Sequence, residues 1–273
     1  MIFTRIITMT SAAIACAPIA YAHEFWIDPP KFQVENDAPF VADLRNGELF
    51  QGTAQSFFES RNTRFEAALG GQISQITGRM GDRPAIQLSA PGQDGLMVIV
   101  HEAAPSTVSY AEWEKFMSFV AHKDFQGVEA LQTQRGWAKE NFKELYTRHS
   151  KSLVAIGSGE GADRAFGLAT EFVALDNPYA ADFDGTLDVA LLYDGAPRGD
   201  AQIEVYARDK DDTVVVTKTR TDAMGLAAIP VDAGTEYLLD AVVLRPLAGA
   251  TTVEAGPVWE TLWATLTFAV PSR

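Results

Sequence analysis

The chain has a single cysteine, Cys16, among its 273 residues. One cysteine can form no internal disulfide and no thiolate zinc site. Basic residues are also scarce, because 22 Lys and Arg stand against 36 Asp and Glu, which gives a net charge of −14. An acidic surface repels nucleic-acid phosphates and anionic lipid head groups. We therefore expect no nucleic-acid partner and no docking on a membrane surface.

Long apolar runs are missing as well. No segment approaches the roughly 20 apolar residues of a membrane-spanning helix, so we expect no direct membrane insertion. The first 22 residues instead combine Arg5, a mostly apolar or small run over residues 6–15, and small residues at Ala20 and Ala22. This pattern is typical of a signal peptide cleaved after Ala22, which predicts a periplasmic or secreted protein. The alternative is a lipoprotein cleaved before Cys16, although residues 13–15 lack the usual Leu.

Cleavage after Ala22 changes the chemistry of the chain. It removes the only cysteine and makes His23 the first residue. A free α-amine and the Nδ1 atom of the same histidine can close one chelate ring, and copper(II) and nickel(II) prefer such nitrogen-rich sites. The alternative is that His23 occupies this position by chance. Because the chain has only four histidines, we take His23 as the primary candidate metal ligand.

The first part of the mature chain alternates strand-like runs with turn signals. The runs predict strands over residues 23–27, 40–44, 72–76 and 96–101. A helical segment is expected next, with a capping box from Ser109 to Glu112 and an apolar face that repeats at helical spacing. The members of that face are Trp113, Phe116, Met117 and Val120. A second helix is predicted over residues 138–153, with Phe142, Leu145, Tyr146 and His149 on its buried face.

The sequence pattern changes after about residue 184. Strands are predicted over residues 186–193, 202–207, 213–219 and 237–244, with short turns between them. We therefore predict a mainly β (α+β) fold. A β-sandwich-like N-terminal domain over residues 23–180 carries a helical insertion at about 109–155. An immunoglobulin-like or transthyretin-like β-sandwich follows over residues 181–273.

Five short motifs resemble one family. They are HEFWIDP at 23–29, YTRHSKSL at 146–153, Glu171-Phe172 with Asn177-Pro178, TDAMG at 221–225 and WATLTF at 263–268. In this order they resemble the periplasmic domain-of-unknown-function family often labelled a nickel-uptake-transporter component. The resemblance spans nearly the whole mature chain and implies a metal-handling role that begins with the same processed histidine. Many members carry a His-Met pair in the strand that matches residues 241–244, which read AVVL here. The choice between copper and nickel therefore stays open.

A second imidazole is needed to complete a site at His23. We rank His101 first, because it lies on a predicted strand that could pair near the first one. His149 comes second, since it lies on a buried face, and a satisfied core histidine is the alternative interpretation. His122 comes last, because a position at a helix C-terminus explains it through the helix dipole.

Three functions from different classes remain open. The first is a metal-binding protein, not an enzyme, that captures divalent copper or nickel with His23, His101 and His149 as candidate ligands. Its acceptor would be a membrane metal transporter or a metalloprotein. The second is a copper oxidase of the histidine-brace type, and the third is a structural β-protein without metal. Hydrolase motifs such as GxSxG and HExxH do not occur.

Overall fold

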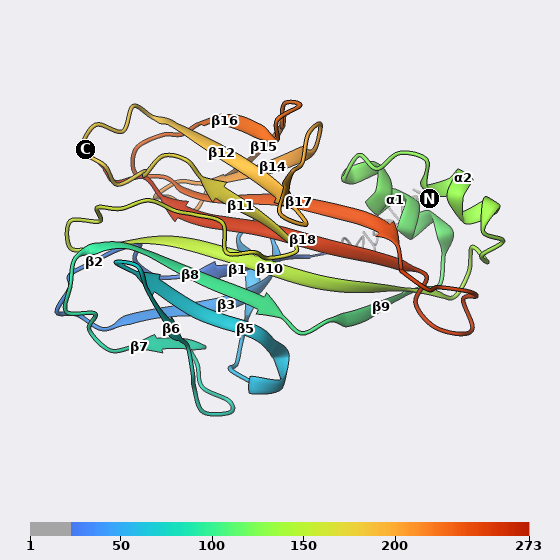
Figure 1. The fold of residues 1–273 in the computed structure, drawn as a ribbon, viewed down its shortest axis with the longest axis horizontal. Coiled ribbons are helices and arrows are strands. Elements are labelled where there is room, and N and C mark those ends of the chain that lie inside the picture. The colour runs from blue at the N-terminus through green and yellow to red at the C-terminus, as the bar shows by residue number, and fades with distance from the viewer. Residues whose placement is uncertain (1–22, 273) are drawn as a thin grey trace, which may run out of the picture.

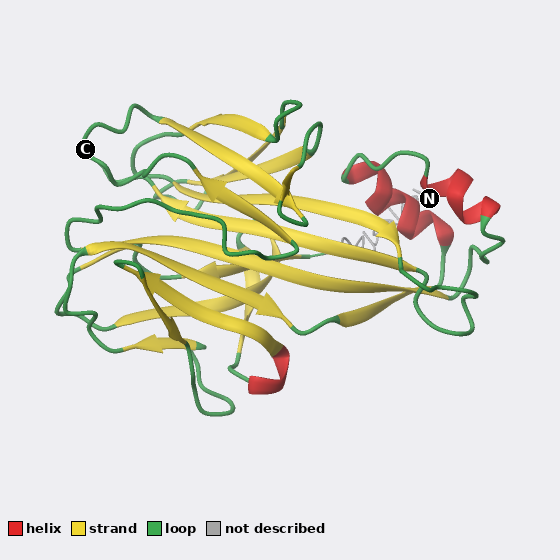
Figure 2. Cartoon of the chain, viewed as in Figure 1, coloured by secondary structure: helices red, strands yellow, loops and turns green. Residues whose placement is uncertain are grey.

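The computed structural model describes residues 23–272, so the expected signal peptide lies outside the described part. Within that part the strands form three sheets, one of ten strands and two of four (Figures 1 and 2). None of the helices found in residues 23–272 is long and apolar enough to cross a membrane. The mainly β, sandwich-like fold class is confirmed.

The ten-stranded sheet runs through the middle of the molecule. Its main path is β15 (Val214–Arg220), β14 (Gln202–Arg208), β17 (Glu236–Pro246), β18 (Trp259–Ala269), β10 (Phe142–Ile156), β8 (Gly95–Ala103), β5 (Asn62–Leu69) and β6 (Gln72–Gln75). The short strands β2 (Gln33–Val34) and β9 (Ser106–Tyr110) also pair with β10. Strands from before and after residue 180 therefore share one sheet, and they meet where β10 and β18 pair in parallel.

The two smaller sheets cover opposite faces of the large one (Figure 1). One contains β1 (Glu24–Asp28), β3 (Phe40–Glu48), β4 (Gln51–Gln55) and β7 (Ile86–Leu88). The other contains β11 (Thr170–Ala174), β12 (Thr186–Tyr193), β13 (Ala196–Pro197) and β16 (Leu226–Pro230). The short 3-10 helix Glu59–Arg61 precedes β5.

Strand alternation divides the core between these faces, because successive side chains point to opposite sides of a sheet. Met97 and Ile99 of β8 pack with Val154 of β10 and with Phe25 of β1 in one buried cluster. We call this side of the large sheet the β1 face. Val98 of β8 packs in another cluster with residues of β12, on the side that we call the β12 face.

Helices α1 (Trp113–His122) and α2 (Val128–Gln134) lie at one end of the long strands (Figures 1 and 2). They bury an aromatic cluster that includes Phe116, Phe142 and Trp259. The predicted helix at residues 113–120 is confirmed. The predicted capping box is wrong, since Ser109 belongs to β9 and the N-cap residue Glu112 makes no side-chain capping bond.

The second predicted helix, over residues 138–153, is wrong. These residues contain most of β10, and the helical part of the expected 109–155 insertion ends with α2 at Gln134. Burial on both sides accounts for part of this, because residues 149–156 are all buried and show no polar–apolar alternation, and over residues 142–148 the alternation is irregular. An apolar spacing of i, i+3, i+4 and i+7 then arises by chance on a central strand. His149 is buried as predicted, but on a strand.

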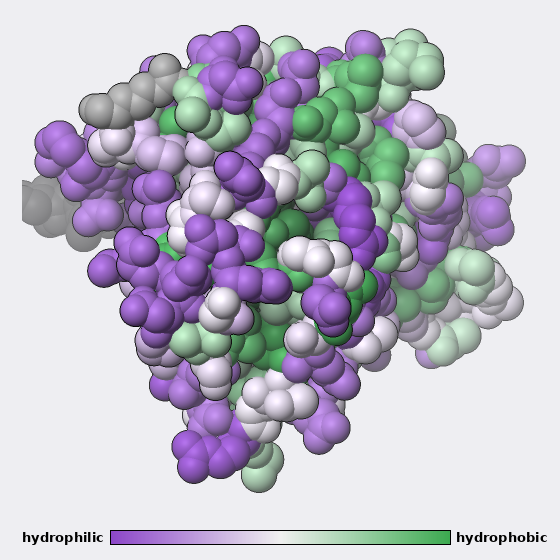
Figure 3. Space-filling view, turned by 60° about the vertical axis from the view of Figure 1, so that its left-hand side comes forward, coloured by the Kyte–Doolittle hydropathy of each residue, from purple (hydrophilic) through white to green (hydrophobic). Residues whose placement is uncertain are grey.

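Hydrophilic residues project over much of the face drawn in Figure 3, with hydrophobic residues visible between them. The exposed large hydrophobic side chains of the described chain are spread over several elements, with Ile73 on β6, Val215 on β15 and Met224 in a turn. Single exposed apolar residues of this kind are common on the surfaces of folded proteins.

Candidate functional site

The backbone of β1 is fixed to the large sheet by hydroxyl groups. Ser150 and Thr265 each place a hydroxyl within hydrogen-bond distance of the Phe25 carbonyl, and Thr267 does the same for Ile27. Arg148 donates from its guanidinium to the carbonyl of His23 at 2.9 Å. The start of the described chain is therefore anchored on the β1 face.

The His23 side chain is half exposed. Its Nδ1 lies 3.3 Å from Oε1 of Glu48, a residue at the end of β3. A carboxylate and an imidazole at this distance can share a proton or a cation, and both are ligand types that divalent metals accept.

His101 is buried and has one ring nitrogen in use. Its Nε2 lies 2.8 Å from Oδ1 of Asn62, while the Asn62 amide nitrogen donates to the Phe58 carbonyl and so fixes the amide orientation. Because Oδ1 can only accept, Nε2 carries the proton and Nδ1 keeps its lone pair. Nδ1 is buried without a hydrogen-bond partner.

The surroundings of His101 keep it neutral. The Phe25 ring stacks on it at 5.2 Å and the Phe65 ring meets it edge-on at 4.8 Å. Burial lowers the pKa of His101 to about 3, with a further contribution from His149. His101 therefore presents the unprotonated form that metals bind.

His149 points to the other side of the sheet. Pairing of Leu153 with Val98 places His149 on the β12 face and His101 on the β1 face. The Nδ1 of His149 donates to the Trp263 carbonyl at 3.0 Å, and burial lowers its pKa. Of the two, only His101 shares a face with His23.

Two neighbouring pockets open on the β1 face. The first, called the His101 pocket, has a volume of about 380 Å³, and its lining includes Phe25, Asn46, Arg61, His101, Tyr146 and Arg148. The second, called the His23 pocket, has about 440 Å³, and its lining includes His23, Asn46, Glu144, Tyr146, Arg148 and Trp263. Asn46, Tyr146 and Arg148 line both, so His23 and His101 lie in adjacent pockets.

Unpartnered buried polar atoms gather around these pockets. They are Oδ1 of Asn46, Nδ1 of His101 and Nε of Arg148, and Oε1 of Glu48 faces His23 without a hydrogen bond. Buried polar atoms in native proteins are nearly always hydrogen-bonded, so these atoms are candidates for contacts with a bound ligand.

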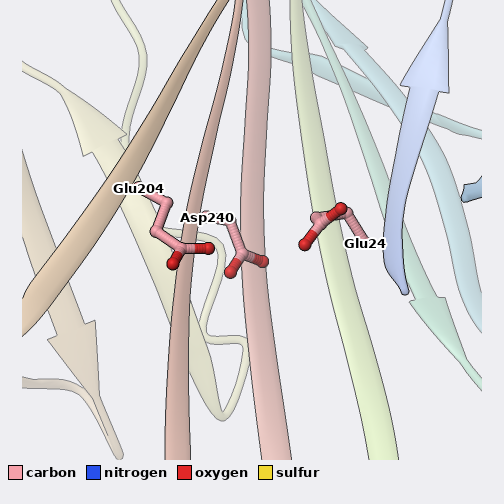
Figure 4. A group of neighbouring side chains, drawn as sticks. All are labelled: Glu24, Glu204 and Asp240. Carbon is pink, nitrogen blue, oxygen red and sulfur yellow. The ribbon is translucent and has the colours of Figure 1, made fainter. Parts of the chain in front are cut away.

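An acidic cluster lies on the same face and includes the first residue of β1, Glu24. Glu24, Glu204 and Asp240 offer oxygen atoms within 4.8 Å of one another (Figure 4). Lys123, just after α1, places its ammonium 2.5 Å from Glu204, 2.7 Å from Asp240 and 3.7 Å from Glu24. Because a lysine already occupies the centre, this cluster is a buried ion-pair network and not an open cation site.

The carboxyl groups of this network have pKa values shifted in opposite directions. Burial raises the pKa of Glu24 to about 7, helped by Asp240, and burial also raises the pKa of Asp240. Burial acts in the same direction on Glu204, but hydrogen bonds and charge from His122 and Lys123 outweigh it and lower its pKa. His122 lies 2.8 Å from this carboxylate, so its position at the end of α1 also has an acidic partner.

Sequence reasoning missed this network. Its carboxylates come from β1, β14 and β17, and the lysine comes from a helix end. No local spacing links them. The available signal was an acidic residue next to apolar runs in three strands, because an acid that is buried there needs a partner.

Glu144, in the wall of the His23 pocket, gives a pH-dependent prediction. It accepts hydrogen bonds from Tyr110 at 3.0 Å and from Thr261, and burial raises its pKa from 4.5 to about 7. A raised folded pKa contributes stability that is complete below pH 4.5 and is lost as the pH rises through 7. Glu144→Gln has no ionisable group at this position, so its free energy of unfolding does not show this fall with rising pH.

The free energy of unfolding of Glu144→Gln relative to wild type should therefore rise by ~3 kcal/mol between pH 4.5 and pH 8. Urea denaturation at both values measures it. Glu129→Gln, at a side chain that is 59% exposed, is the control and should show no such change. A constant difference for Glu144→Gln would contradict the raised pKa.

Comparison with known proteins places this arrangement in a family. The family described as "Domain of unknown function (DUF4198)" matches residues 20–245. The chain belongs to the DUF4198 family. This confirms the expected membership of a domain-of-unknown-function family, and the matched range includes β1, both pockets' histidines and the acidic cluster.

Other comparisons add little to the DUF4198 assignment. No curated protein matches the chain. One solved structure, titled "Crystal structure of tetra-tandem repeat in extending region of large adhesion protein", aligns with 90% of this chain at 10% identity. The alignment covers 49% of that chain with a TM-score of 0.23, a similarity too low to support any argument.

Proposed function

We propose that this DUF4198 protein is a periplasmic metal-binding protein. It captures divalent copper or nickel through His23, after cleavage at Ala22, and passes the ion to a transporter or a metalloprotein. The observation that carries the proposal is the unused Nδ1 lone pair of His101, on the sheet face that also holds His23.

The surroundings of both histidines support this role. Metal-ligating histidines usually donate their second ring N–H to a nearby acceptor, which fixes the ring, and Asn62 does this for His101. Arg148 holds the His23 carbonyl, which leaves the α-amine and imidazole of a processed chain free to chelate. Glu48 is the adjacent carboxylate. His149 has no part in this proposal, because its Nδ1 donates to the Trp263 carbonyl and its side chain lies on the β12 face.

The test compares the processed protein with a version that has one glycine before His23. The extension turns a bidentate chelate into a lone imidazole, so we expect binding of Cu²⁺ and Ni²⁺ to weaken about 100-fold or more. Equilibrium dialysis measures both, and mass spectrometry first establishes that each chain begins where intended. Lowering the pH from 8 to 5 should also weaken binding, because amine and imidazole must lose their protons to ligate.

Two variants separate the roles of the histidines. Asn62→Ala removes the group that orients His101 and should weaken metal binding about 10- to 100-fold. His122→Asn removes an imidazole outside the proposed site and serves as the control. Equal affinity in the glycine-extended and processed proteins would show that His23 is not the ligand. Peroxide production by the copper-loaded protein with a reductant would favour the oxidase instead.

A further inference from the structure

The His101 pocket differs in charge from the molecule around it. The chain as a whole has a net charge of −14, yet the residues that line this pocket include Arg61, Arg148 and the neutral His101, and no Asp or Glu. Low-dielectric walls with one sign of charge concentrate ligands of the opposite sign. The two guanidinium groups therefore give this pocket the means to hold a small anion.

Arg148 is the group best placed to hold that anion. One end of its guanidinium donates to the His23 carbonyl, while its Nε is buried without a partner. The guanidinium also lies against aromatic rings, 4.6 Å from the centre of Tyr146 and 5.9 Å from that of Phe25. A guanidinium fixed in this way has little freedom left to lose when a carboxylate binds.

Asn46 supplies a hydrogen-bond acceptor that complements the Arg148 donor. Its Oδ1 is buried without a partner, and it can only accept a hydrogen bond. Arg148 and Asn46 thus offer one unused donor and one unused acceptor in the wall of the same pocket. A simple anion such as acetate would satisfy only the donor. A ligand that satisfies both needs a carboxylate and an N–H or O–H group.

We propose that the His101 pocket binds a small organic carboxylate that also carries an amine or hydroxyl group, with the carboxylate on Arg148 and the donor on Asn46. Amino acids and hydroxy acids share this chemistry. The volume of about 380 Å³ and the apolar wall of Phe25, Leu44 and Tyr146 suit a side chain of aromatic size. This binding does not depend on a metal at His23.

The test uses three compounds that differ at one position. L-phenylalanine carries an amine, L-3-phenyllactate a hydroxyl and 3-phenylpropionate neither. Calorimetric titration of metal-stripped protein, dialysed free of chelator, should give binding of phenylalanine or phenyllactate at least about tenfold tighter than that of phenylpropionate. Phenylalanine as the tighter ligand assigns an amino acid, and phenyllactate a hydroxy acid.

Variants assign the two contacts. Arg148→Gln should weaken all three ligands about tenfold or more, and Asn46→Ala should remove the difference between the preferred ligand and phenylpropionate. Arg79→Gln, at a side chain that is 91% exposed, is the matched control and should leave all affinities unchanged. Melting curves establish that each variant is folded.

Three outcomes would overturn the proposal: no binding of any member, equal binding of all three, or affinities that Arg148→Gln leaves unchanged. The proposed metal function fails on different evidence, namely unchanged copper and nickel binding in the glycine-extended protein without any organic ligand.

Discussion

Lys123→Met should destabilise the fold by about 3–5 kcal/mol at pH 8, because it leaves buried carboxylates without their cation. The Lys123 side chain is 4% exposed and makes its ion pairs with Glu204, Asp240 and Glu24. The half-exposed Lys218 pairs with Glu204 at 3.2 Å and donates to the His122 carbonyl, so it is not placed to neutralise Asp240 and Glu24 as well. Urea denaturation of the variant and the wild type measures the loss.

The same variant should show a distinctive pH dependence. Burial already raises the pKa values of Glu24 and Asp240, and loss of the ammonium removes a group that lowers them. As the pH falls these carboxyls become neutral, so the penalty of Lys123→Met should be smaller at pH 5 than at pH 8. Adding Asp240→Asn should restore part of the stability at pH 8.

A matched control is the exposed Lys210, whose side chain is 82% exposed. Lys210→Met should change the free energy of unfolding by less than about 0.5 kcal/mol. If the free energy of unfolding of Lys123→Met stays within about 1 kcal/mol of the wild-type value at pH 8, Lys123 does not neutralise buried charged carboxylates.

Phe116→Ala should cost about 3–5 kcal/mol, since it opens a cavity between α1 and the large sheet. The ring is completely buried and contacts the rings of Tyr110, Phe142 and Trp259, with centroid distances of 5.0, 5.1 and 5.8 Å. Phe142→Ala should cost a similar amount from the sheet side of the same contact. Thermal and urea unfolding measure both losses.

Phe116→Leu tests the cavity explanation, because it retains much of the buried volume and should cost clearly less than alanine. Val215→Ala, at a side chain that is 57% exposed, is the surface control. A Phe116→Ala protein that melts at the wild-type temperature would show that the helices do not cover the sheet in solution.

Local pattern predicted short strands that turn signals bound, including strands that are buried on both faces. The expected strand over residues 186–193 matches β12, and those near 202–207 and 237–244 match β14 and β17 closely. It failed for β10, where the apolar residues over 142–149 follow a helical spacing and residues 149–156 are buried on both faces without alternation. Position in the sheet, which is a tertiary property, decided the outcome there.

The candidate site, too, could be predicted only in part from the sequence. The sequence singled out His23 and His101, but it could not decide between His101 and His149, because their faces depend on the register of β8 against β10. Arg148 was quoted only as part of the YTRHSKSL motif, and neither Arg148 nor Asn46 was predicted to contact a ligand. Their unused hydrogen-bonding atoms are visible only when the surrounding side chains are in place.

The parallel pairing of β10 with β18 has a consequence for how the chain folds. Ser150 and Thr265, partners in this ladder, are 115 residues apart, and β18 is the last strand of the described chain. Contacts of such long range require a large loop to close before they can form, and they are typical of slow folding. During synthesis β10 is therefore made long before β18, and the ladder that joins the two parts of the large sheet can form only after β18 has been made.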